Sequence, residues 1–253
     1  MELTRANYHS IEARQEYMGV SQFKDFCKCE AHALAVVKGE WQDPTTDALL
    51  VGSYVDEYFN GTLTEFKAAH PEMFNSRTGE LKAPFKKAEE IIARIERDPF
   101  MKRKLGGKRQ VIMTGVIDGV KWKIMIDSMH RGTTVDGKVM KDCEDVYVPG
   151  EGYKPFWAAY GYDIQGYVYQ TIRAQNEGVK KPFELAVATK EDEPDLRVFR
   201  FTESTLNGAM YRVLEYTRRF DNIKKGLIEP TRCEHCAYCR ATKKLNTKSV
   251  EEV

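Results

Sequence analysis

Apolar and polar residues follow a strand-like pattern in the middle of the chain. Two apolar-rich segments between Gly115 and Asp127 are joined at Asp118-Gly119, a dipeptide suited to the positive φ angles of a tight hairpin turn. The pattern therefore predicts two neighbouring strands. The second of them ends on the carboxylate of Asp127.

A third strand is predicted from Lys138 to Val148, after a second Asp-Gly turn at residues 136–137. Side chains alternate between the faces of a strand, so Asp142 and Glu144 would project from the same face. If Asp127 lies on that face of a neighbouring strand, three carboxylates converge, which is unfavourable unless cations neutralise them. Because hard divalent ions prefer oxygen ligands, the pattern predicts a Mg2+ or Mn2+ site.

Helical and strand-like patterns alternate along the rest of the chain. The spacing of apolar residues predicts helices, and short apolar runs predict two more strands, at the following positions: helices at 49–61, 85–95, 160–178 and 204–223, and strands at 183–189 and 196–201. This order indicates an α/β fold with a central mixed sheet flanked by helices. We expect a single domain with a helical part (1–108), a core (109–202) and a C-terminal helix with a cysteine run (203–245).

Composition and charge narrow the class of protein. The 253 residues carry a formal net charge of +1, so any contact with nucleic acid must use local basic patches rather than a global attraction. The chain has no apolar run of about 18 residues and no apolar signal segment at its start, so we expect no membrane association and a cytoplasmic location. The six cysteines are then expected to be reduced.

Three of the cysteines form a compact run near the end of the chain. Cys233, Cys236 and Cys239 have the spacing Cys-x2-Cys-x2-Cys. Thiolates spaced so closely are typical of a soft-metal site. The run lacks a fourth ligand, which another part of the chain would have to supply.

The order of these motifs resembles the PD-(D/E)XK nuclease superfamily. An acidic strand, an Asp-x-(Lys or Glu) strand and a helix carrying Gln165 and Tyr169 at i and i+4 are similar to its RecB-like branch and to RecE-type phage exonucleases. The resemblance implies that Asp127 and Asp142 bind Mg2+ or Mn2+. The carbonyl of Cys143 would be a further ligand.

The resemblance also assigns roles to the neighbouring side chains. Gln165 and Tyr169 would position the substrate strand or the metal ligands. Asp56 stands where RecB-like nucleases have a metal-site histidine, so its carboxylate would join the metal site. Glu144 stands where the superfamily has its lysine, and it would act as a catalytic metal ligand. Lys121, Lys123 and Lys141 are the lysines that we consider as substitutes.

The cysteines are similar to the iron–sulfur staple of AddB and of CRISPR-associated RecB-like nucleases. Cys29 matches the early ligand of that staple better than Cys27 does, so Cys29, Cys233, Cys236 and Cys239 are expected to hold a [4Fe-4S] cluster. Zinc is the alternative, since it uses the same thiolates and can also take His235.

These motifs lead to three functional hypotheses. The first is a DNA exonuclease of a phage-type recombination system, encoded by a phage or prophage in a bacterial cell. Its partners would be DNA, a single-strand annealing protein and further copies of itself. The second is a catalytically degenerate nuclease fold that binds DNA or protein, because Glu144 replaces the lysine. The third is a purely structural iron–sulfur or zinc protein.

Overall fold

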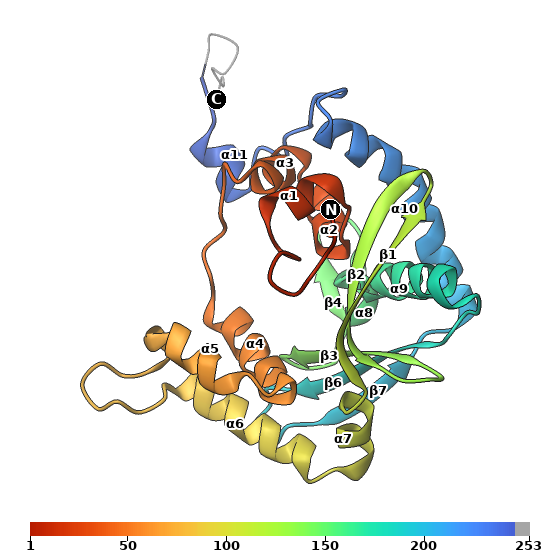
Figure 1. Cartoon of the computed structure of the whole chain (residues 1–253). Coiled ribbons are helices and arrows are strands. Elements are labelled where there is room, and N and C mark those ends of the chain that lie inside the picture. Colours follow the sequence, from red (N-terminus) through yellow and green to blue (C-terminus); the bar gives the residue numbers. More distant parts are fainter. Residues whose placement is uncertain (246–253) are drawn as a thin grey trace. The chain divides into compact units, whose positions relative to one another are not determined.

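The computed structural model describes residues 1–245, and its helices and strands are labelled in Figure 1. The chain forms two compact units. One contains Met1–Asp43, Val116–Trp122 and the chain from Val213 onward, and the other contains Pro44–Gly115 and Lys123–Arg212. Units defined by contacts are not by themselves domains, so the single-domain organisation stays a prediction.

A mixed five-stranded sheet is the centre of the fold. The strand order is β1-β2-β3-β6-β7. Strand β3 pairs parallel with β6, whereas β2 pairs antiparallel with β3 and β6 pairs antiparallel with β7. The strand bounds are as follows: β1 Lys108–Ile117, β2 Val120–Met129, β3 Thr134–Met140, β6 Phe183–Thr189 and β7 Leu196–Arg200, with β4 Val146–Val148 and β5 Gly152–Lys154 forming a separate hairpin. The predicted α/β class with a mixed sheet is thus confirmed.

Helices cover both faces of the part of the sheet formed by β3 and β6. On one face, Val135, Ala186 and Ala188 belong to an apolar core with residues of α4 (Asp47–Asn60), α6 (Ala83–Glu96) and α7 (Pro99–Leu105). On the other face, α9 (Tyr162–Glu177) packs on β6. A Cβ at Gly166 of α9 would lie 2.9 Å from the Phe183 ring, so this glycine permits the close approach.

Large aromatic side chains form the core of the smaller unit. Phe23 and Phe26 of α2 (Val20–Lys28) contact Phe220 of α10 (Glu203–Lys224), and Phe23 also contacts the fully buried Trp122. Burying each of these rings contributes roughly 2 to 3 kcal/mol.

The remaining helices are α1 Ile11–Glu16, α3 Glu30–Lys38, α5 Leu63–Ala69, a 3-10 helix Pro71–Met73, α8 Phe156–Ala159 and α11 Ala237–Ala241.

Most predicted elements are confirmed. Asp118 and Gly119 connect β1 to β2 with φ angles of 49° and 78°, as the hairpin prediction requires. Among residues 1–245, no helix has both the length and the apolar character that a membrane crossing needs.

The third strand was predicted in the wrong place. Strand β3 includes residues 136–137 and ends at Met140, because all seven of its residues pair with β6. Gly137 does not form a turn. Its missing side chain makes room for a neighbouring helix, since a Cβ there would lie 3.3 Å from Cδ2 of Leu105.

Candidate metal-dependent active site

An acidic pocket lies where β2, β3 and α4 meet. Its lining includes Asp127 from β2, Lys138 from β3 and Asp56 from α4. The Gly137 backbone N–H donates to Asp127 Oδ2 at 3.2 Å, which directs this carboxylate toward β3. A Cβ built on Gly137 would lie 3.8 Å from Asp56 Oδ1, so Asp56 borders the same backbone position.

Asp136 supplies a third carboxylate to this group. Side chains alternate along β3, so Asp136 and Lys138 share a face. Asp136 is 1% exposed, and its Oδ1 accepts a 2.7 Å hydrogen bond from Gln165 Nε2. Lys138 Nζ lies 2.5 Å from Oδ2, so this buried oxygen is ion-paired with an ammonium and has no further donor among residues 1–245. A carboxylate oxygen that faces only a cation can also bind a metal ion.

The electrostatics of the pocket show strong coupling between these groups. Burial, together with repulsion from Asp136, raises the pKa of Asp127 well above its usual range. Burial also raises the pKa of Asp56 to about 6, although attraction to Lys138 opposes the increase. Burial disfavours the ammonium of Lys138, but three carboxylates outweigh it and raise the pKa of this lysine. The pocket therefore gathers more carboxylates than cations, with Lys138 and Arg109 as its positive groups.

Helix α9 supports the pocket through two side chains one turn apart. Gln165 holds Asp136 of β3, and the Tyr169 hydroxyl donates to the Met125 carbonyl of β2 at 2.9 Å. Both contacts reach the strands that carry the carboxylates. The predicted pair at i and i+4 therefore lies beside the acidic group, with Gln165 in direct contact with it.

The donor set fits a hard divalent cation. Asp56, Asp127 and Asp136 offer carboxylate oxygens, and oxygen ligands are what Mg2+ and Mn2+ prefer. Lys138 adds a cation that can hold a water molecule or a phosphate oxygen. Arg109 also lines the pocket, with hydrogen bonds to the Asn60 side chain and the Leu105 carbonyl. Carboxylates, a lysine and an arginine around one pocket can bind metal and phosphate together.

The structure places Asp142, Cys143 and Glu144 in the loop after β3, so Asp142 and Glu144 do not share a strand face as predicted. Asp142 pairs with Lys141 at 3.1 Å, and its Oδ1 accepts the Glu144 backbone N–H at 3.0 Å. These local contacts, with the Glu144 N–H first, lower the pKa of Asp142. The predicted convergence with Asp127 does not occur, because the chain leaves the sheet at Met140.

Sequence reasoning missed Asp136 and Lys138. The signal was present, because residues 135–139 alternate apolar or small residues with an acid and a base. The prediction of a turn at Asp136-Gly137 hid the Asp-x-Lys spacing of residues 136–138.

Three other lysines were considered as substitutes for the superfamily lysine. Lys141 is exposed and Lys121 pairs with Glu16 at 3.0 Å, whereas Lys123 is buried.

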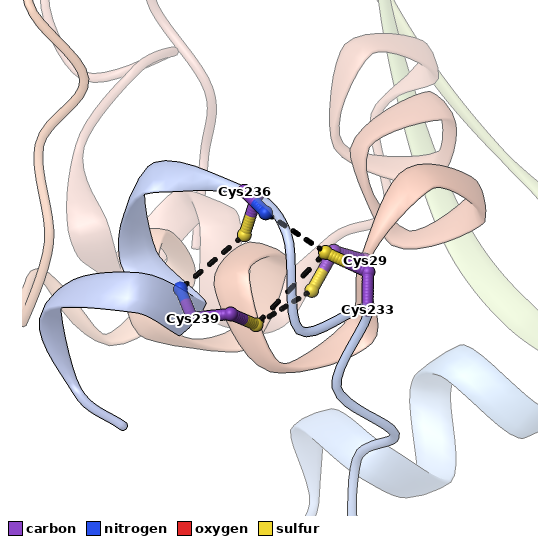
Figure 2. Close-up of side chains that lie close together, drawn as sticks. All are labelled: Cys29, Cys233, Cys236 and Cys239. Carbon is purple, nitrogen blue, oxygen red and sulfur yellow. Dashed lines mark hydrogen bonds between the residues drawn. The ribbon is translucent and has the colours of Figure 1, made fainter. Parts of the chain in front are cut away.

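A second group of ligand residues is formed by four cysteines of the smaller unit. The sulfur atoms of Cys29, Cys233, Cys236 and Cys239 all lie within 4.8 Å of one another. Figure 2 shows these side chains pointing toward a common centre. Burial raises the pKa of the Cys233 thiol, but the N–H groups of His235 and Cys236 outweigh it and lower this pKa to about 6. The predicted gathering of these four cysteines is confirmed, and Cys27 is exposed.

The mixed sheet, its covering helices and the acidic pocket define a PD-(D/E)XK-like nuclease fold. The chain belongs to the family described as a PDDEXK-like domain of unknown function (DUF3799), whose model matches residues 19–242. It is also similar to a solved structure of a presumed exonuclease from Eubacterium rectale, with 48% sequence identity and a TM-score of 0.93. That match covers 97% of this chain and 95% of the other. No curated protein matches the sequence.

Proposed function

We propose that the protein is a Mg2+- or Mn2+-dependent deoxyribonuclease, and specifically an exonuclease of a phage-type recombination system. The observation that carries the proposal is the group of carboxylates of Asp56, Asp127 and Asp136 around Lys138, whose ammonium pairs with Asp136. Membership in a PDDEXK-like family and similarity to a presumed exonuclease support the same activity.

Each side chain of the pocket has a role in this proposal. Asp127 and Asp136 bind the metal, and Asp56 binds it directly or through water. When bound, the ion stabilises charge on the scissile phosphate and makes a water molecule more acidic. Lys138 orients the attacking water, and its ammonium is kept charged by the carboxylates around it. Gln165 and Tyr169 are positioning residues, because they contact Asp136 and the β2 backbone.

Asp142, Cys143 and Glu144 have no part in this proposal. Lys138 lies two residues after Asp136, which is the spacing that the superfamily pattern gives to its lysine. Glu144 is therefore not needed as a substitute for the lysine. The main argument for a degenerate, non-cutting module is thereby removed. Four parts of the proposal follow from the resemblance alone. They are DNA ends as the substrate, an annealing protein as a partner, assembly into homo-oligomers and a location in a bacterial cytoplasm.

A pair of matched variants tests the proposal. Linear and closed circular duplex DNA would be incubated with the protein in Mg2+, Mn2+ or EDTA. We expect degradation of linear DNA only, dependent on the ion and lost in Asp136→Asn. Asp142→Asn removes a carboxylate only six residues away and should leave the rate within about twofold, because this residue lies outside the pocket. Full activity of Asp136→Asn, or loss of activity in Asp142→Asn alone, would reject the assigned site.

A further inference from the structure

The distances between the four cysteine sulfurs distinguish two kinds of metal centre. Sγ of Cys239 lies 3.6 Å from Sγ of Cys29 and 4.0 Å from Sγ of Cys233. With Cys236 included, every pair of these sulfurs is within 4.8 Å. The four ligands thus surround a small space (Figure 2).

One tetrahedral ion and an iron–sulfur cube need different spacings. A Zn–S bond of about 2.3 Å places the sulfurs of a tetrahedron about 3.8 Å apart. In a [4Fe-4S] cluster each thiolate binds a different iron, so the four sulfurs lie roughly 6 Å apart. The observed distances agree with the single ion and do not fit the cube.

Hydrogen bonds join the segment that carries Cys29 to the segment that carries Cys233, and they hold the sulfurs at the spacing of a single ion. The Ala31 N–H, two residues after Cys29, donates to the Thr231 carbonyl at 3.0 Å. The Glu30 carboxylate accepts both the backbone N–H and the hydroxyl of Thr231, each at 2.8 Å. Thr231 is two residues before Cys233. Moving the two cysteine segments apart to fit a cube would therefore strain or break these partly buried contacts.

Glu30 is itself fixed by a further ion pair. Arg219 donates from Nε and Nη2 to the two carboxylate oxygens of Glu30 at 2.6 and 2.8 Å, and Glu30 is 7% exposed. Such a bidentate pair has strict geometry. The anchor between the Cys29 segment and the Cys233 segment is thus rigid.

Two overlapping turns bring the remaining sulfurs together. The Cys236 N–H donates to Cys233 Sγ at 3.3 Å, and the Cys239 N–H donates to Cys236 Sγ at 3.4 Å. These hydrogen bonds curl the backbone around the sulfurs. Among residues 1–245, His235 is not part of the ligand group, so the donors are four thiolates.

We infer that Cys29, Cys233, Cys236 and Cys239 bind a single metal ion in a tetrahedral four-thiolate site, with zinc as the physiological ion. Zinc matches the ligand type, the number of ligands and the spacing of the sulfurs. This departs from the iron–sulfur cluster that the resemblance to AddB implies. The inference does not depend on the nuclease activity, because the site is defined by its own residues.

Metal and sulfide analysis of the full chain provides the test. The protein would be produced with iron and zinc both supplied and purified without oxygen. We expect about one zinc per chain, no acid-labile sulfide and no visible colour. About four iron atoms per chain with an equal amount of acid-labile sulfide, and a brown colour, would overturn the inference.

Two further measurements make the test independent of any folding defect. Replacement of the native metal of the wild-type chain by Co2+ should give about one bound ion and the intense absorption of a tetrahedral thiolate site. A weak spectrum typical of six oxygen ligands would overturn the inference. In Cys239→Ser we expect the bound zinc to fall at least tenfold, while Cys27→Ser should retain it, because Cys27 is exposed and outside the group. Equal zinc loss in both variants would count against the assigned ligands.

Discussion

Gln165 Nε2 donates a 2.7 Å hydrogen bond to Asp136 Oδ1, and both side chains are buried. This contact leaves the second oxygen of Asp136 free of hydrogen bonds among the described residues, and it fixes the direction in which that oxygen points. An amide that orients a carboxylate in this way controls metal affinity without touching the ion.

The first prediction concerns this positioning contact. Gln165→Ala should raise the metal concentration needed for half-maximal activity by about 10-fold to 100-fold, because Asp136 loses its orienting partner. The measurement is a metal titration of nuclease activity. Gln170→Ala is the matched control, since Gln170 is equally buried on the same helix but bonds to Lys181 and Glu203. An unchanged metal titration in Gln165→Ala would show that this residue does not position Asp136 for metal.

The second prediction concerns the single lysine among the carboxylates. In EDTA, Lys138→Met should lower the free energy of unfolding by about 3 kcal/mol, because it leaves the three carboxylates with Arg109 as the remaining cation of the described pocket. Added Mg2+ should restore much of this loss, whereas activity should stay low. Urea unfolding in EDTA and in Mg2+ measures the effect. Lys141→Met serves as the control, because Lys141 is 93% exposed.

A Lys138→Met protein as stable as wild type in EDTA would contradict the electrostatic account. It would mean that the carboxylates are already protonated or far enough apart not to need the lysine. Rescue of stability by Mg2+ in the variant, without rescue of activity, would separate the structural role of Lys138 from its role in cleavage.

The third prediction is a dependence of stability on pH that arises from Glu184, which is not one of the carboxylates of the acidic pocket. Glu184 of β6 is 2% exposed and pairs with Lys104 at 2.5 Å and with Arg200 at 2.6 Å. Burial alone would raise its pKa, but hydrogen bonds from Lys104 and Arg200 outweigh burial and lower it. The folded pKa thus lies below the unfolded value of about 4.3, so this carboxylate stabilises the fold above that value.

The contribution of Glu184 should disappear as the pH falls through its folded pKa. At pH 7, Glu184→Gln should lower the free energy of unfolding by about 2 kcal/mol, an amount reduced because Arg200 is largely exposed. Once the pH is below the lowered folded pKa, the difference from wild type should vanish. Unfolding curves from pH 7 to pH 3 measure this, with the exposed Glu191→Gln as control. A constant difference at every pH would indicate a packing defect instead of a charge effect.

The sequence predicted the fold well wherever the signal was local. Residues 183–189 form β6 because a run that is apolar except at Glu184 and Thr189 suits a strand covered on both faces. Asp118-Gly119 forms the β1–β2 turn because both residues adopt positive φ. The spacing of the late cysteine run indicates a metal site by itself, whereas Cys29 was predicted as its fourth ligand from the resemblance to the iron–sulfur staple.

The acidic site was predicted only in part, because Asp-Gly has two structural uses. A hairpin turn and a close helix–strand approach both favour glycine, and only pairing with a strand that begins at Phe183 decides between them at Gly137. That pairing is not local, so periodicity alone could not reveal it. Periodicity also could not decide between Cys27 and Cys29 as the fourth ligand. In the structure Cys29 is buried against the late cysteines, whereas Cys27 is exposed.

The contact between Cys29 and Cys239 spans 210 positions in the chain, which has a consequence for biosynthesis. A ribosome that adds 5 to 20 residues per second needs roughly 10 to 40 s between the first and last of these cysteines. During that time the first thiol has no complete ligand set, so a nascent chain cannot form the four-thiolate site. Metal insertion therefore has to follow the synthesis of Cys239, and a chain that terminates before this residue would lack the complete set of four ligands.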